Sequence, residues 1–85
     1  MVNQDGRYRT SDTALAAFLI TEHFLLVFID YSKPRFEWLF KDSEQIRESA
    51  NNYIIGNAFT DPSKYSRVFR KANRILRKQC QWEDD

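Results

Sequence analysis

The 85-residue chain has one cysteine, two glycines, two prolines and one histidine. With Cys80 alone, neither an internal disulfide nor a cysteine-based zinc cluster can form. Two glycines are too few for a glycine-rich loop that cradles phosphate. The length allows one domain. This pattern is typical of a protein from a reducing, cytoplasmic compartment.

Long hydrophobic runs are missing as well. The longest, Ala14–Ile20 and Phe24–Ile29, fall far short of the ~20 residues that span a bilayer. The N-terminal segment MVNQDGRYRT lacks the apolar region of a secretory signal. We therefore expect no membrane partner and a cytoplasmic location.

The sequence also lacks a recognisable catalytic set. Nothing brings His23 close to Cys80, and a nucleophile needs a base within hydrogen-bonding reach. The carboxylates of Asp42, Glu44 and Glu48 lie at an expected helix start, where the helix dipole accounts for them. We expect no enzymatic activity, no cofactor, no bound metal and no small-molecule substrate.

Aromatic residues, by contrast, are plentiful: seven Phe, four Tyr and two Trp. Their large side chains allow a small chain to build a sufficient core. Polar residues 1–9 suggest a flexible arm. A helix is predicted over residues 12–22, with Ser11 as its N-cap. It is apolar almost all round from Ala14 to Ile20, so we expect it to be covered on more than one side.

A β-hairpin is predicted next, because apolar and polar residues alternate in RFEWLFK, residues 35–41. Its loop is expected at Tyr31–Pro34, with Asp30 opposite Arg35. This register puts six residues on the core face: Leu25, Val27, Ile29, Phe36, Trp38 and Phe40. The other face would expose Leu26, Phe28 and Leu39.

Two further helices are indicated by their end signals. The second begins after Asp42 or Ser43 and ends near Gly56. The third starts at the cap Asp61, followed by proline, and extends to about Cys80. Residues 81–85 would form a frayed acidic tail. The predicted fold is a single α+β domain over residues 10–80, in the order α-β-β-α-α, with a β-hairpin packed on three helices.

The segments TSDTALAAFL and FEWLFKDSE, followed by a helix and a basic last helix, resemble a small domain-of-unknown-function family, numbered 5659, of bacterial and phage proteins. The resemblance covers residues 10 to 78. It implies the fold described above and no particular activity. It also leads us to expect a glycine before the first strand of the hairpin, where this chain has Glu22, His23 and Phe24.

The last helix is strongly basic. Between Ser63 and Lys78 there is no acidic residue. Seven of the chain's 13 basic residues lie there: Lys64, Arg67, Arg70, Lys71, Arg74, Arg77 and Lys78. Solvated helix faces usually mix charges, because like charges at helical spacing repel. Three explanations remain open: pairing with acids of the same fold, binding of nucleic-acid phosphates, and docking on an acidic protein.

We expect a small non-enzymatic binding module that contacts nucleic-acid phosphates through these seven residues. The alternative is a protein-interaction module, such as a phage- or defence-related adaptor or inhibitor. It would act through the basic helix or through Leu26, Phe28 and Leu39, a surface that would also suit a homodimer.

Overall fold

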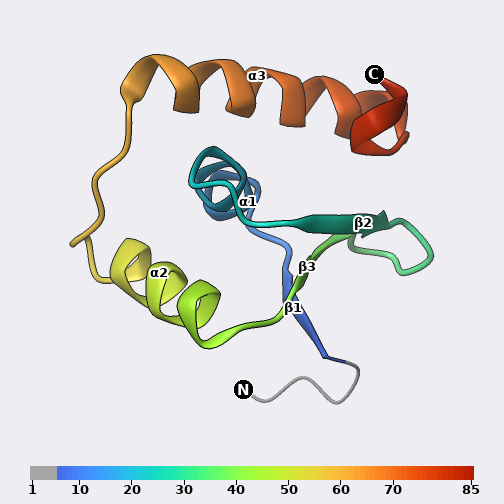
Figure 1. The fold of residues 1–85 in the computed structure, drawn as a ribbon. Coiled ribbons are helices and arrows are strands. Elements are labelled where there is room, and N and C mark those ends of the chain that lie inside the picture. Colours follow the sequence, from blue (N-terminus) through green and yellow to red (C-terminus); the bar gives the residue numbers. More distant parts are fainter. Residues whose placement is uncertain (1–5) are drawn as a thin grey trace.

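Within residues 6–85, a three-stranded antiparallel sheet and three α-helices make up the fold (Figure 1). The computed structural model describes residues 6–85. The elements are β1 (Arg7–Thr10), α1 (Thr13–Thr21), β2 (Leu26–Asp30), β3 (Glu37–Lys41), α2 (Glu44–Ile54), α3 (Pro62–Lys78) and a 3-10 turn η1 (Trp82–Asp84). The sheet order is β1-β3-β2. The predicted α+β class is confirmed.

Helix α1 lies at the centre of the molecule. Figure 1 shows it almost end-on, with α3 above it, α2 at the lower left and the sheet at the lower right. Its residues from Leu15 to Leu19 are all buried. A helix that is apolar all round must be covered on several sides, and the sequence-based expectation of such cover is confirmed.

The N-terminal segment differs from its prediction. Arg7–Thr10 forms strand β1, which pairs antiparallel with β3, so residues 7–9 are not a flexible arm. The first five residues of the expected arm lie outside the described part of the chain. The N-cap of α1 is Asp12 rather than Ser11, because the Asp12 carboxylate accepts hydrogen bonds from the backbone N–H groups of Ala14 and Leu15.

The β2–β3 hairpin forms, but its register is shifted by two residues. Asp30 lies opposite Glu37, and Ile29 opposite Trp38. The loop is longer than expected because the Asp30 carboxylate accepts hydrogen bonds from the backbone and hydroxyl of Ser32 and so turns the chain early. An irregularity between Leu26 and Phe28 shifts the pairing further along β2.

Burial on the hairpin differs from the prediction, although a shift of two residues by itself leaves every side chain on its original face. Leu25 and Val27, expected in the core, are exposed, Leu25 to 64%. Leu39, expected on the open face, is only 2% exposed. It belongs to the central strand, where Phe28 on β2 and Arg9 on β1 are its cross-strand neighbours on either side.

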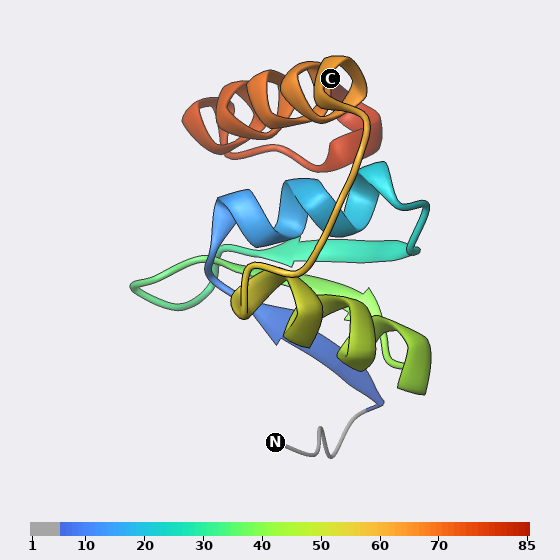
Figure 2. The same cartoon turned by 90° about the vertical axis from the view of Figure 1, so that its left-hand side faces the viewer.

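The helices on the sheet share one face. Figures 1 and 2 show α1 and α2 on the same side, while α3 lies over α1. Ile46 and Ala50 of α2 join the core around Trp38 and Phe40. In both views, none of the three α-helices of residues 6–85 lies on the opposite face of the sheet.

The local signals for α2 and α3 are confirmed. Ser43 caps α2, and Gly56 follows its end with a φ of 77° that suits glycine. Asp61 caps α3 by accepting hydrogen bonds from the backbone N–H groups of Ser63 and Lys64, and Pro62 occupies the first turn. Helix α3 ends at Lys78, after which Gln79 adopts a left-handed conformation.

The C-terminal segment is not frayed. The Gln81 side chain accepts a hydrogen bond from the Ile29 N–H at 2.7 Å and donates one to the Ile29 carbonyl at 2.8 Å. These backbone groups belong to β2, an edge strand, so a side-chain amide replaces a neighbouring strand there. The ring of Trp82 meets that of Trp38 edge to face at 6.2 Å.

We predict that Gln81→Ala destabilises the fold by about 1–3 kcal/mol, because it leaves two partly buried backbone groups of Ile29 without partners. Gln81→Glu keeps the acceptor but puts a second oxygen against the Ile29 carbonyl, so it should not restore stability. Urea unfolding monitored by tryptophan fluorescence measures both changes. Wild-type stability in both variants would contradict a role for this contact in holding the segment.

Candidate functional site

Helix α3 presents a basic surface because its apolar side is fixed on α1. Ala72 and Ile75 are fully buried, and Tyr65 stacks on Phe69 with ring centroids 5.9 Å apart. The Tyr65 hydroxyl donates a hydrogen bond to the Ala14 carbonyl of α1 at 3.3 Å. Burial, reinforced by its neighbour Tyr53, raises the pKa of Tyr65 to about 12, so this hydroxyl stays neutral. The opposite side of α3 faces solvent (Figure 2).

The C-terminal half of the basic face is occupied by the chain's own tail. The Arg74 guanidinium makes a two-pronged contact with the Asp85 carboxylate, at 3.0 Å from Nε and 2.5 Å from Nη2. Lys78 reaches the same carboxylate at 3.3 Å. The Lys71 ammonium lies 4.4 Å from the centre of the Trp82 ring. Of the three explanations for the basic helix, pairing within the fold therefore accounts for Arg74 and Lys78.

Hydrogen bonds from Arg74 and then from Lys78 hold the pKa of Asp85 well below its usual range. The carboxylate is thus ionised at all ordinary pH values and keeps its two partners. Because each of these two cations has a charge partner, they are poor candidates for an external phosphate.

The remaining cations of α3 have no acid of this kind. Lys64, Arg67 and Arg77 form no ion pair with any residue between 6 and 85, and Arg70 donates a hydrogen bond only to the hydroxyl of Ser66, at 2.8 Å. Lys64, Arg67 and Arg70 follow one another at intervals of three residues. They lie in the N-terminal half of the helix. Arg77 lies near the other end. The tail therefore divides the seven predicted cations into groups. Lys71, Arg74 and Lys78 contact the tail, whereas Lys64, Arg67 and Arg70 at one end and Arg77 at the other do not.

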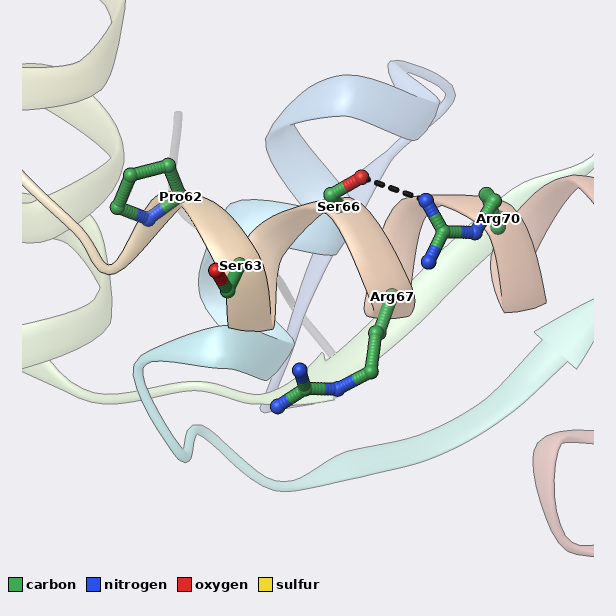
Figure 3. A pocket seen from close by; sticks show the side chains of 5 residues that line it. All are labelled: Pro62, Ser63, Ser66, Arg67 and Arg70. Carbon is green, nitrogen blue, oxygen red and sulfur yellow. Dashed lines mark hydrogen bonds between the residues drawn. The ribbon is translucent and has the colours of Figure 1, made fainter.

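A shallow hollow of about 410 Å³ lies along this N-terminal half. It is lined by Pro62, Ser63, Ser66, Arg67 and Arg70 (Figure 3). Residues 63, 66, 67 and 70 come together because residues three and four apart share one side of a helix. Two hydroxyls and two guanidinium groups line the hollow, and no carboxylate does. We call it the serine–arginine hollow.

A second, smaller hollow of about 210 Å³ lies on the other side of Arg67. Its lining residues are Ile20, Thr21, His23, Lys64, Arg67 and Val68. It joins the end of α1 and the following turn to α3, and Arg67 lines both hollows. We call it the histidine hollow.

The expected apolar interface on the hairpin is not a continuous surface. Leu39 is buried, Leu26 packs partly against the core, and Phe28 is 38% exposed with the Arg7 guanidinium 6.0 Å from its ring centre. Among the large apolar side chains of residues 6–85, Phe59 is the most exposed, at 88%. It lies between α2 and α3, in a segment from which the sequence predicted no site.

Two classes of site find no support in the described chain. No helix in residues 6–85 is both long and apolar enough to cross a membrane. Over the same residues, no three His, Cys, Asp or Glu side chains gather in a way that would hold a metal ion. His23 is exposed and lies in the turn after α1, whereas Cys80 lies beyond the C-terminus of α3.

Comparison with protein-family models, with curated proteins and with solved structures found no match. The resemblance to the family of unknown function therefore stays a prediction, and the site must be interpreted from its own chemistry.

Sequence reasoning missed Ser63, Ser66 and His23 as lining residues. The spacing of Ser63, Ser66 and Arg70 does place them on one side of a helix, and that signal was present. His23 lies beside α3 because α1 packs against α3, a contact between segments distant in the sequence. No local sequence pattern predicts that position. One residue could have predicted that the C-terminal segment packs on the fold. Trp82 is a large apolar side chain in an otherwise polar segment, and such a side chain is normally covered.

We predict that Asp85→Asn lowers the melting temperature slightly at neutral pH, because Arg74 and Lys78 lose their common partner. The pKa of Asp85 is lowered in the folded protein, so its contribution is complete above the unfolded-state pKa of ~3.9 and disappears as pH falls below it. The difference between wild type and variant should thus shrink as the pH is lowered from 4 towards 2. Thermal unfolding across this range tests it; a constant difference would contradict the assignment.

Proposed function

We propose that this protein is a non-enzymatic module that binds the phosphates of nucleic acid through Lys64, Arg67 and Arg70 on the N-terminal half of α3. One observation carries the proposal: the serine–arginine hollow is lined by two hydroxyls and two guanidinium groups, with no carboxylate among them. Phosphate oxygens are acceptors only, and arginine contacts them with paired N–H donors.

The electrostatics of the helix favour the same ligand. Three cations at successive intervals of three residues repel one another, and an external anion would relieve that repulsion. They cover ~9 Å of helix length, at ~1.5 Å per residue. This length suits a few neighbouring phosphates of one backbone and is too short for extended contact with a groove.

Contacts of this type position a backbone and carry no sequence information by themselves. The surface supports binding of moderate strength, because few phosphates are involved and salt screens each contact. Asp61 already caps the N-terminus of α3, so the ligand would be held by side chains rather than by the helix end.

We predict that the double change Arg67→Gln and Arg70→Gln weakens binding of a generic oligonucleotide at least tenfold at ~50 mM salt. Both residues are exposed, so the apolar side of α3 and its cap are untouched and the melting temperature should hold or rise slightly. Fluorescence anisotropy with a labelled oligonucleotide measures the affinity.

The matched control is the double change Arg35→Gln and Lys41→Gln. It removes the same charge from exposed positions in the β2–β3 loop and at the end of β3. It should weaken binding far less. Equal loss in both variants would mean that only overall charge matters. Absence of binding by the wild type at this low salt concentration would refute the proposal, and binding of polyglutamate instead would favour an acidic protein partner.

A further inference from the structure

We infer that the ligand of this surface is single-stranded nucleic acid, and that the histidine hollow accepts one unpaired base beside the phosphate held in the serine–arginine hollow. The inference rests on the proposed function and adds the strandedness of the ligand and a second subsite.

The two hollows differ in chemistry although they share Arg67. The serine–arginine hollow offers hydrogen-bond donors, whereas the histidine hollow has the apolar side chains of Ile20 and Val68 in its lining. Thr21 adds no donor there, because its hydroxyl already donates to the Ala17 carbonyl at 2.7 Å. The polar contribution comes from the imidazole of His23 and the cations Lys64 and Arg67.

A nucleotide likewise has one charged part and one largely apolar part. Its phosphate is an anion with acceptor oxygens, and its base is a flat apolar face with polar edges. Proteins hold unpaired bases by stacking them on aromatic rings, histidine or the arginine guanidinium plane. Figure 3 shows the Arg67 side chain leaving the helix on a different side from that of Arg70, and Arg67 is the arginine that lines both hollows. A phosphate on one side of Arg67 and its base on the other would use both.

A duplex fits this surface less well. It presents its charged backbones outward and keeps its bases stacked inside, so the apolar lining of the histidine hollow would face phosphate or remain empty. An unpaired strand can turn a base into the hollow without breaking a base pair. The hollow, at about 210 Å³, is also of a size to hold the ring system of one base and is too small for the backbone of a duplex.

His23 is held at the rim by the backbone and contributes little to the fold. Its φ is 70°, in the left-handed region that favours glycine, and its backbone N–H donates to the Ile20 carbonyl at 2.9 Å. The side chain is exposed. A glycine would adopt this conformation more readily, so His23→Gly removes the imidazole while keeping or improving stability.

The chain contains a single histidine, so its ring protons give isolated NMR signals that report on this hollow alone. We would titrate the protein with a short oligothymidine, with an abasic oligonucleotide of the same length, and with a duplex, at low salt. The oligothymidine should shift the His23 signals and bind about fivefold or more tightly than the abasic strand. The abasic strand should still bind, without shifting those signals comparably.

In His23→Gly, the preference for oligothymidine over the abasic strand should shrink while abasic binding is retained. Equal affinity for both strands, with unmoved His23 signals, would overturn the base subsite and leave the proposed function standing. Tighter binding of the duplex would overturn the inference in the same way. Failure of all three nucleic acids to bind would overturn both proposals, and His23 shifts with polyglutamate alone would assign the hollow to an acidic protein.

Discussion

The burial of α1 is the constraint on which the rest of the structure depends. Residues 15–19 of this helix are all buried, and no side of it offers a polar face to water. A sheet of three short strands covers one side of a helix only. Helices α2 and α3 must therefore cover the other sides of α1, and they do so with their apolar stripes.

This requirement fixes the orientation of α3, and with it the candidate site. Because Ala72 and Ile75 pack inward, Arg67 and Arg70 point away from the core, and Lys64 lies at the flank of the helix, where it lines the histidine hollow. The tail then follows the C-terminal half of the same helix, guided by Gln81 on the edge of β2 and by Trp82 against Trp38. Asp85 reaches Arg74 and Lys78 as a result. Packing thus sets which cations remain for a ligand.

Local signals in the sequence predicted most element boundaries. Asp61 with Pro62, Ser43, and Gly56 each act within a few residues, so their effects appear in short segments. The alternation of residues 35–41 likewise predicted β3. These signals were sufficient for the α+β class and for the three helices.

Two of the errors are local, namely the N-cap of α1 and the Asp30–Ser32 turn, and the others involve contacts between distant segments. Strand β1 forms because Arg7–Thr10 pairs with β3, which lies some thirty residues later in the chain. The short segment itself has no alternating pattern that would predict a strand or its partner. The register error arose from the Asp30–Ser32 turn. Leu39 was expected to be exposed because the sequence did not show that pairing with β1 makes its strand the central one of the sheet. For the site, the seven cations were identified, but their division into paired and exposed groups depends on Asp85, far along the folded tail.

The salt dependence of binding tests the central claim most directly, which is that of the seven cations of α3 only those in its N-terminal half contact the phosphates of the ligand. For a single strand, the logarithm of affinity falls against the logarithm of salt with a slope of ~−0.7 per phosphate contacted. Two or three contacts from Lys64, Arg67 and Arg70 predict a slope of about −1.4 to −2.1. A slope near −5, which corresponds to all seven cations and a displaced tail, would contradict this account, as would no binding at all.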